Sequence, residues 1–275
     1  MQPITLTTDF GLRDAYVAAL KGVILGINPK AIIVDISHFI QPQNIKQAAF
    51  VLSTVHRYFP KDTIHAVIVD PGVGSQRRAI ILKTQEALFV APDNGVLSYV
   101  IHSASAPPRG ASPEAGSMAL TPGVLAVEIT DPRFWHHPVS TTFHGRDIFA
   151  PVAAHLSLGV PPQQFGEPVT SLTVFPLPRP QLGPGGEIIG QVLHIDIFGN
   201  IITSIRQEDL RPGRLHLQIA GQRIDALTAT YANAEVDQLH AVVGSSGYVE
   251  IAVRNGSAAA LLGVKLGDEV RINNG

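Results

Sequence analysis

The sequence contains no cysteine among its 275 residues. This absence excludes disulfide bonds, thiolate nucleophiles and cysteine-based zinc sites. Charged residues are also scarce, at 15%, and the formal net charge is −2. The chain has no basic run and no interleaving of basic and aromatic residues. It therefore offers no charged feature for a nucleic acid or an anionic membrane, and we expect neither as a partner.

Long apolar runs are missing as well. No run reaches membrane-spanning length, and the first residues, MQPITLTTDF, lack the basic and apolar regions of a secretory signal. We therefore expect a cytoplasmic protein. Hydrophobic residues nevertheless make up 45% of the chain, which is typical of a globular protein with one large domain or two ordinary ones.

The first half of the chain alternates strand and helix patterns. The expected elements are, in order, a strand ITLTT (4–8), a helix over 16–27 with Asp14 as its N-cap, a buried strand AIIVDI (31–36), a helix over 45–55 and a strand IHAVIVD (64–70). Asn28-Pro29 and Phe59-Pro60 are expected to end the two helices. This rhythm predicts an α/β domain with a mostly parallel layered sheet over residues 1–173, and a ligand at the carboxyl ends of its strands.

The pattern changes after residue 173. The segment VFPLPRPQLGPGG (174–186) is rich in proline and glycine, which is typical of a linker between domains. Short strand patterns then follow, separated by Gly, Asn and Asp turns. They predict a smaller all-β domain over residues 187–275, built as a small barrel or sandwich.

Carboxylates stand at the ends of the expected strands. Asp9, Asp35 with His38, and Asp70 all occupy such positions, which favours a shared site, although aspartate is also a common turn residue. The segment VIVDPGVGSQRR (67–78) contains no phosphate-binding glycine motif. Taken alone, it predicts an ion pair between Asp70 and Arg77 at a turn.

Two further segments combine polar and aromatic residues. In TTFHGRDIFAP (141–151), His144 is a candidate general base, metal ligand or structural residue. In HIDIFGNIITSI (194–205), Asp196, Phe198 and Asn200 form either a hairpin turn or a small-molecule clamp. Such a clamp would offer a carboxylate for a cation, a ring for stacking and an amide to contact a base edge.

Several motifs together resemble one family. They are TTDFGLRDAY, VDPGVGSQRR, APDNGVLS, FHGRDIFAP, DIFGN and SSGYVEIAVRNGSA, in the expected order across nearly the whole chain. In this combination the chain resembles the S-adenosylmethionine-dependent adenosyltransferase and hydrolase family, which includes the fluorinating and chlorinating enzymes. The similarity is greatest to the non-halogenating branch, which implies a hydrolase that uses water and releases adenosine and L-methionine.

The resemblance also implies a set of site residues. The catalytic set is Asp70, Arg77 and His144, which the fluorinating enzymes do not carry. For the nucleoside, the resemblance implies contacts of Asp9 with the ribose hydroxyls, of Phe143 and Phe198 with the pocket walls, and of Asn200 with the adenine edge. For the methionine end, it implies contacts of Asp14 and Asp196 with the ammonium. Asn94 is implied within the substrate site, and Ser245, Ser246 and the backbone near Asn255 are implied on the methionine carboxylate or the base. The halogenating enzymes have an arginine where Ser246 falls.

The resemblance further implies a homotrimer in which the N-terminal domain of one subunit meets the C-terminal domain of a neighbour, with the active sites at the subunit interfaces. The substrate is a small molecule. No cofactor and no metal are expected, because the sulfonium leaving group is already activated. The fluorinating enzymes also carry an extra loop after the arginine region, which this chain lacks, and this difference disfavours halide chemistry.

The proposed chemistry is attack of water at the ribose C5′. We expect Asp70 and His144 to share the proton of the water while Arg77 positions the carboxylate, and the sequence leaves open which of the two accepts it. Two alternatives remain. One is a metal-dependent phosphohydrolase with a metal bound by strand-end residues, namely Asp9, Asp35, His38, Asp70 and His144. The other is a non-catalytic protein that binds S-adenosylmethionine or adenosine.

Overall fold

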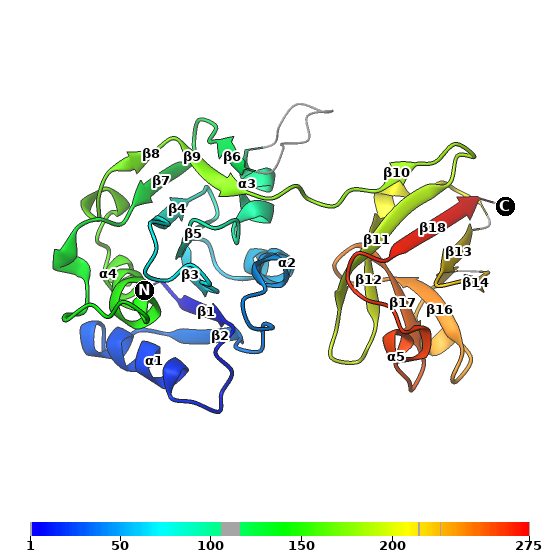
Figure 1. The fold of residues 1–275 in the computed structure, drawn as a ribbon, viewed down its shortest axis with the longest axis horizontal. Helices are drawn as coiled ribbons and strands as arrows, with labels where there is room; N and C mark the ends of the chain where they lie inside the picture. Colours follow the sequence, from blue (N-terminus) through cyan, green and yellow to red (C-terminus); the bar gives the residue numbers. More distant parts are fainter. Residues whose placement is uncertain (1, 106–115, 214, 226, 275) are drawn as a thin grey trace. The chain divides into compact units, whose positions relative to one another are not determined.

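The computed structural model describes residues 2–105, 116–213, 215–225 and 227–274. The chain divides into two compact units, Met1–Pro176 and Leu177–Gly275, here called unit 1 and unit 2 (Figure 1). Within the expected linker, Val174 ends strand β9 (Ser171–Val174), and Gln181–Leu182 form β10, which pairs with a strand of unit 2. None of the helices in the described part of the chain has the length and hydropathy needed to cross a membrane.

Unit 1 is built on a seven-stranded sheet with the order β2-β1-β3-β5-β4-β7-β8. The strands are β1 (Ile4–Thr8), β2 (Ile33–Ser37), β3 (Thr63–Ile68), β4 (Ala79–Lys83), β5 (Ala87–Pro92), β7 (Leu125–Glu128) and β8 (Pro168–Val169). The first four in this order run parallel, and the other three are added antiparallel. A separate pair is formed by β6 (Gly116–Ala119) and β9. The α/β class is therefore confirmed, and the antiparallel half of the sheet was not foreseen.

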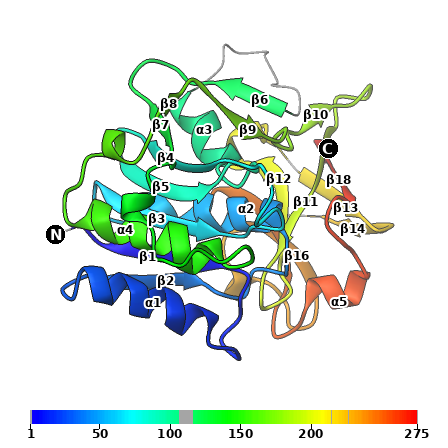
Figure 2. The ribbon, with the colours of Figure 1, turned by 60° about the vertical axis from the view of Figure 1, so that its left-hand side comes forward.

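Helices cover both faces of this sheet (Figures 1 and 2). They are α1 (Tyr16–Ile27), α2 (Ile45–Val55), α3 (Ser98–Ala104) and α4 (Ala150–Ser157). Side chains of β3 alternate between two apolar clusters: Ile64 and Ile68 pack with α1 and α4, whereas Val67 packs with α2 and α3. This two-sided burial explains why the strand reads as one continuous apolar run. Each fully buried aliphatic side chain contributes about 1.5–3 kcal/mol.

The helix ends are partly as expected. α1 stops at Ile27 before Asn28-Pro29, and α2 has the expected bounds, with the Asn44 side chain accepting a hydrogen bond of 3.0 Å from the Gln47 N–H. The prediction that Asp14 caps α1 is wrong. Ala15 occupies the N-cap position without a side-chain hydrogen bond, so the helix begins one residue later than an Asp14 cap requires.

The expectation that AIIVDI forms a buried strand is also wrong. Only Ile33–Ser37 form β2, and β2 lies at the edge of the sheet with Val34 37% exposed. An edge strand has a neighbour on one side alone, so an apolar run does not by itself show that the strand is central.

In its described residues, unit 2 has a nine-stranded sheet, one short α-helix and two 3-10 helices. The sheet is curled (Figures 1 and 2). Its elements are β10, β11 (Ile188–Ile195), β12 (Ile201–Arg206), β13 (Leu215–Ile219), β14 (Gln222–Ile224), β15 (Leu227–Thr228), β16 (Leu239–Val243), β17 (Tyr248–Val253), α5 (Ala258–Leu262) and β18 (Glu269–Asn274). Inward-facing residues such as Val192, Ile251 and Ile272 form its apolar cluster. From Ile188 to Val192, buried and half-buried positions of β11 alternate, which follows the two-residue period of a strand.

A buried histidine in the sheet of unit 1 makes stability dependent on pH. His65 of β3 is fully buried, accepts or donates a hydrogen bond of 2.7 Å with the Thr5 hydroxyl, and stacks on Phe89 with ring centroids 5.2 Å apart. Burial, aided by the nearby His56, lowers the pKa of His65 from 6.5 to about 3. The unfolded chain therefore takes up a proton between these two pH values, and the folded chain does not.

We expect the free energy of unfolding to fall by about 3 kcal/mol between pH 7 and pH 4 because of this one group. Urea titrations across that range should show that the free energy of unfolding depends less steeply on pH in the His65→Gln variant than in the wild type. The glutamine amide can still bond to Thr5. The matched control is His136→Gln at an exposed histidine, which should leave the slope unchanged. Equal slopes in wild type and His65→Gln would contradict the prediction.

Candidate functional site

Unit 1 contains a cavity of about 630 Å³ at the carboxyl ends of β1 and β3. This is the edge of a parallel sheet at which ligands bind in α/β proteins. The residues that line the cavity come from four loops, the end of β3, the start of α1 and the helical turn that begins at Gly145: Asp9, Phe10, Tyr16, Pro42, Gln43, Ile68, Asp70, Pro71, Val73, Ser140, Thr142, Phe143, His144, Gly145 and Arg146. Four of the predicted site residues are among them: Asp9, Asp70, Phe143 and His144.

Arg77 joins two of these residues directly. Its Nε donates to Asp70 Oδ1 at 2.9 Å, and its Nη2 donates to Asp70 Oδ2 at 2.5 Å. The same Nη2 lies 2.9 Å from Nδ1 of His144. The Asp70 and Arg77 side chains are only 7% and 11% exposed, so this contact is well shielded from solvent. The structure thus brings Asp70, Arg77 and His144 together in one cluster.

His144 is positioned by an irregular helical turn. The residues Gly145–Phe149 form a π-helix that continues into α4. Asp147 in this turn is fully buried, accepts a hydrogen bond of 2.7 Å from the Ser140 N–H, and pairs with Arg146. Such π-helical insertions occur frequently at functional sites. Burial and the Arg77 charge lower the pKa of His144, so the imidazole is neutral at pH 7.

Asp9 lies at the mouth of the cavity, directly after β1. Its Oδ2 accepts a hydrogen bond of 2.8 Å from the backbone N–H of Gln43, which has a positive φ of 65°. This hydrogen bond holds the carboxylate in place beside the cavity. Asp14, by contrast, is exposed and does not line the cavity; its role stays a prediction.

The aromatic wall of the cavity is larger than the sequence indicated. Phe143 packs edge-on against Phe10 and Tyr16, with ring centroids 5.8 and 5.3 Å apart. Both partners stand in TTDFGLRDAY, the segment that also contains Asp9. The sequence signal for this aromatic wall was Tyr16, an aromatic residue at the start of a helix and close in sequence to the strand-end carboxylate Asp9. Tyr16 is 49% exposed, which is unusual for a side chain with only a structural role.

Asn94 and Arg78 have partners within unit 1. Asn94 Nδ2 donates to the Val69 carbonyl at 2.9 Å, which ties the end of β5 to the end of β3. Arg78 pairs with Asp93 and also donates to the Ser171 carbonyl at 2.9 Å. Neither residue lines the cavity. For Arg78 the structure indicates a role in holding β4, β5 and β9 together.

The predicted residues of unit 2 lie in turns. Asp196 Oδ1 accepts hydrogen bonds of 2.9 Å from the backbone N–H groups of Phe198 and Asn200, and its Oδ2 accepts one from the Asn200 side chain. This is the hairpin turn between β11 and β12. Phe198 at its tip is 74% exposed, as a ring available for stacking would be.

Two other turns of unit 2 hold the rest of the predicted set. Ser245 and Ser246 form the turn between β16 and β17, which the bond from the Gly247 N–H to the Gly244 carbonyl closes at 2.9 Å. Asn255 follows β17 and has a positive φ of 65°, a backbone conformation that asparagine tolerates better than most residues. The substrate roles of these residues stay predictions.

The residues of the metal alternative do not come together. Asp35 pairs with Lys21 at 2.6 Å and lies 3.1 Å from His38, whereas Asp70 is bound to Arg77. Across residues 2–105, 116–213, 215–225 and 227–274, no group of three or more His, Asp or Glu side chains could hold a metal ion. The predicted convergence of Asp35 and His38 with Asp9 and Asp70 is therefore wrong: Asp35 of β2 turns to Lys21 of α1, and the His38 ring bonds to the Thr8 hydroxyl at 2.8 Å.

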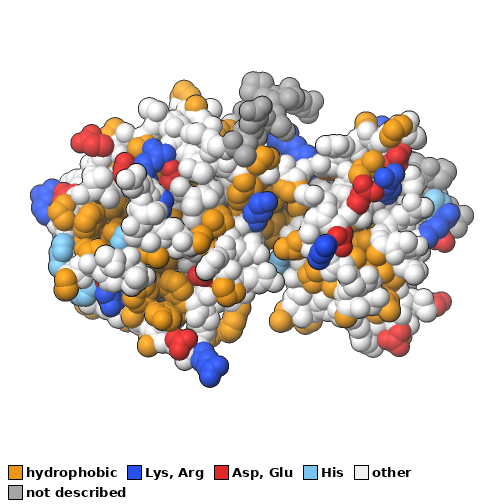
Figure 3. Space-filling model, in the orientation of Figure 1, with side chains coloured by type: hydrophobic (Ala, Val, Ile, Leu, Met, Phe, Trp, Pro, Cys, Tyr) orange, Lys and Arg blue, Asp and Glu red, His pale blue; other side chains and the backbone are white. Residues whose placement is uncertain are grey.

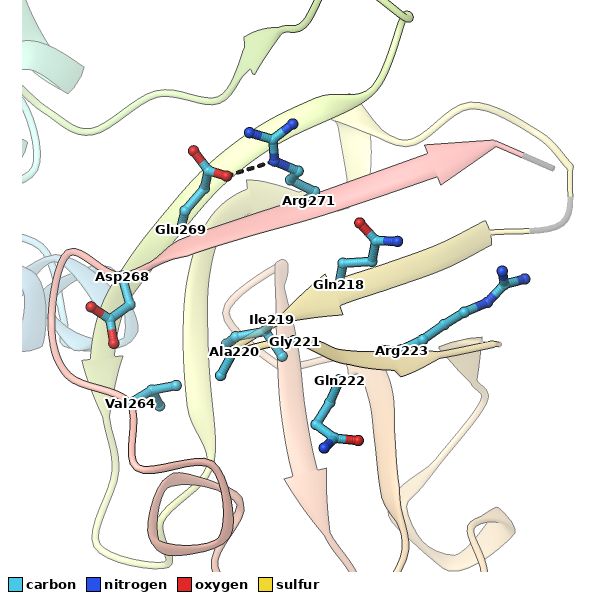
Figure 4. Close-up of a pocket in the computed structure, with 10 residues that line it drawn as sticks. All are labelled: Gln218, Ile219, Ala220, Gly221, Gln222, Arg223, Val264, Asp268, Glu269 and Arg271. Carbon is cyan, nitrogen blue, oxygen red and sulfur yellow. Dashed lines mark hydrogen bonds and ion pairs between the residues drawn. The ribbon is translucent and has the colours of Figure 1, made fainter.

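Unit 2 also has a cavity, of about 520 Å³, beside the β13–β14 hairpin (Figure 4). Its charged side chains are largely neutralised: Arg271 pairs with Glu269 at 2.6 Å, and Arg223 pairs with Asp225 at 2.5 Å. None of the predicted site residues lines it.

The face drawn in Figure 3 shows positive and negative side chains scattered rather than gathered into one patch. This distribution fits the expectation of a small-molecule substrate.

Comparisons with known proteins match both units of the chain. The family models for the N-terminal and C-terminal domains of SAM hydroxide adenosyltransferases match residues 4–166 and 190–271. The (R)-S-adenosyl-L-methionine hydrolase of Salinispora tropica is 37% identical over 99% of this chain and 98% of its own. The fluorinase of Nocardia brasiliensis is 27% identical over 99% of this chain and 97% of its own.

Among solved structures, an uncharacterized conserved protein from Thermotoga maritima superposes with a TM-score of 0.86 at 35% identity, covering 98% of this chain and 99% of its own. The matched residues span both units of the chain. From the cluster of Asp70, Arg77 and His144 at a strand-end cavity and from these full-length similarities, we conclude that the chain belongs to the SAM hydroxide adenosyltransferase family.

Proposed function

We propose that this protein hydrolyses S-adenosyl-L-methionine to adenosine and L-methionine. The observation that carries the proposal is the contact of Arg77 with both Asp70 and His144 beside the cavity of unit 1. The curated relatives of the same length that are named hydrolases support the substrate. The name of these relatives specifies the (R) epimer at sulfur, and we propose the same epimer as the substrate of this protein.

The chemical step is an in-line displacement at C5′. The oxygen of one water forms a bond to C5′, the C5′–S bond breaks, and its electron pair returns to sulfur, so that neutral methionine leaves. One proton of the water passes to a protein base and then to solvent. Because the leaving group is a sulfonium, the step requires neither a Lewis acid nor a general acid, and the proposal includes no cofactor and no metal.

The donor pattern supports Asp70 as the group that accepts the proton. A guanidinium has only donors, so His144 Nδ1 must accept the bond from Arg77 Nη2. The neutral imidazole then carries its hydrogen on Nε2 and can only donate from that side. The Ser140 carbonyl, which raises the pKa of His144, is a second acceptor at the ring besides a water. We therefore propose that the Asp70 carboxylate accepts the proton, that His144 orients the water by donation, and that Arg77 holds both.

The role of His144 can be tested with two substitutions. His144→Ala removes the Nε2–H donor, and kcat is expected to fall about 100-fold. His144→Gln supplies an amide N–H in its place and should retain at least a tenth of the wild-type kcat. A glutamine amide can donate a hydrogen bond but cannot take up a proton, so an equal loss of kcat in the two variants would instead assign the base to His144.

The substrate contacts are proposed from the resemblance of the motifs, and for Asp9 and Phe143 also from their place in the cavity lining. Asp9 binds the ribose hydroxyls, and Phe143, with Phe10 and Tyr16, contacts the nucleoside. The other proposed contacts are Asp14 and Asp196 with the ammonium, Phe198 and Asn200 with adenine, and Ser245, Ser246, Asn255 and Asn94 with the remaining polar groups of the substrate.

The proposal includes an assembly. Residues 1–173 form the nucleoside-binding catalytic domain, 174–186 the linker, and 187–275 a smaller β domain of barrel or sandwich type that completes the site. We propose a homotrimer in which this second domain comes from a neighbouring copy, located in the cytoplasm and without a nucleic-acid partner.

The experiment is to incubate the purified protein with each sulfur epimer of S-adenosyl-L-methionine, with and without chloride, bromide or fluoride, and to identify the nucleoside by chromatography. Adenosine as the product, in amounts that halide and excess chelator do not change, supports the proposal. A halogenated nucleoside would contradict it. Tight binding without turnover would indicate the non-catalytic alternative, and phosphatase activity lost on chelation would indicate the metal-dependent one.

A further inference from the structure

A buried carboxyl group of unit 2 has no role in the chemistry above. Glu250 lies in β17, between Ile202 of β12 and Val242 of β16, and is 8% exposed. Its Oε2 accepts a hydrogen bond of 2.5 Å from the hydroxyl of Tyr231. Placing a carboxyl group in such a position is costly, and an apolar residue would suit the strand better. The group therefore calls for a functional explanation.

Glu250 lies against the turn that carries Ser245 and Ser246. A Cβ placed on Gly244, where this turn begins, would come within 1.7 Å of Glu250 Oε1. Only glycine leaves room for the carboxyl group in this arrangement. The glycine at position 244 thus allows the acidic group of Glu250 to pack directly against the turn.

Asp196 closes the hairpin that leads into β12, the strand whose Ile202 pairs with Glu250. Burial raises the pKa of Glu250, the hydrogen bond from Tyr231 lowers it, and the negative charge of Asp196 raises it. The same charge also contributes to the raised pKa of Tyr231. His240 of β16 packs on Tyr231, with ring centroids 5.9 Å apart, and Arg254 after β17 donates to the Ala234 carbonyl at 3.1 Å.

We propose that Glu250 determines substrate specificity: its carboxylate adds to the charge of Asp196 and makes this part of unit 2 select the cationic amino-acid end of the substrate over neutral nucleosides. The proposal rests on the proposed function, since it takes S-adenosyl-L-methionine as the substrate and Asp196 as its ammonium contact. Tyr231 is a positioning residue in this scheme, because its hydroxyl orients the Glu250 carboxyl group.

The test compares a charged and a neutral ligand in the Glu250→Gln variant, whose amide oxygen can still accept from Tyr231. We expect the KM for S-adenosyl-L-methionine to rise about 5- to 10-fold with kcat unchanged, from the loss of one charge at short range. The inhibition constant of 5′-methylthioadenosine, which has neither ammonium nor sulfonium, should not change. The rise in KM should also shrink at high salt, because ions screen the charge.

The pH dependence provides a second readout. Glu250 becomes charged as the pH rises through its raised pKa, so the KM of the wild type should fall over that range and the KM of Glu250→Gln should not. The matched control is Glu208→Gln, which removes the charge of an exposed carboxyl group of unit 2 and should leave KM within about twofold. Equal weakening of both ligands, or of neither, would overturn the proposal.

Failure of the proposed function is distinguishable from failure of this inference. If the wild type releases no adenosine, the proposed function is wrong. Calorimetric titration of the Asp70→Asn protein with the same two ligands, with and without Glu250→Gln, still measures the selectivity for charge. Loss of affinity for S-adenosyl-L-methionine alone supports the role of Glu250, and any other pattern contradicts it.

Discussion

Replacement of Asp70 by asparagine is expected to lower the kcat for adenosine release about 1000-fold, since the proposed base is lost. The substitution keeps the size of the side chain and removes its charge. The asparagine would keep one oxygen to accept from Arg77, whereas its NH2 group would face the second Arg77 donor, and Arg77 Nη2 also contacts His144. The measurement is single-turnover release of adenosine at saturating substrate, which separates the chemical step from binding.

A neighbouring ion pair provides the control. Asp93 pairs with Arg78 much as Asp70 pairs with Arg77, and its side chain is 4% exposed. It does not line the cavity. Asp93→Asn should leave kcat within about twofold and lower the free energy of unfolding by about 1–3 kcal/mol. If Asp70→Asn kept more than about a tenth of the wild-type kcat, the carboxylate would not be the base.

Mixed trimers of two impaired variants are expected to regain activity. Asp70→Asn alters the cavity of unit 1, and Asp196→Asn alters the hairpin turn of unit 2 while keeping an oxygen for the backbone N–H groups. Each variant alone should lose about 30-fold or more in kcat/KM. In a mixed trimer with sites shared between neighbouring copies, one site of the three combines an intact Asp70 with an intact Asp196, so that about one third of the wild-type activity should return.

The experiment requires co-expression of the two variants with different tags and purification over both. Activity is measured at substrate concentrations below KM, where the Asp196 contact matters most, and the mass of the assembly by light scattering. A mixed trimer no more active than its parents would show that each site is built from one chain. A monomeric mass would reject the proposed assembly itself.

Much of unit 1 could be predicted because its signals are local. The spacing of apolar residues predicts the bounds of α2 and the existence of β1, β2 and β3. The helix-ending pair Asn28-Pro29 predicts where α1 stops. The errors are at positions where local rules compete. Asp14 is a good capping residue that the helix does not use, and the run AIIVDI has the composition of a central strand although β2 is an edge.

The candidate site likewise combines contacts that the sequence predicts with contacts that it does not. Asp70 and Arg77 are seven positions apart across a glycine turn, so their pairing could be expected from the sequence. The contact of Arg77 with His144 spans 67 positions, and no periodicity carries that information. The resemblance named all three residues, but the direction of the hydrogen bonds, from which the role of His144 follows, required the placement of the π-helix against β3.

What the sequence by itself determined is the chemistry that is available and where strands and helices form, because composition, period and turn residues act over a few positions. It excluded thiol chemistry and placed carboxylates at strand ends. Only the tertiary structure decided which of those carboxylates meet: Asp9 and Asp70 share a cavity, whereas Asp35 turns to Lys21. The reason is physical. Long-range contacts depend on which faces of the sheet each helix buries, and that choice is made by the packing of the whole unit.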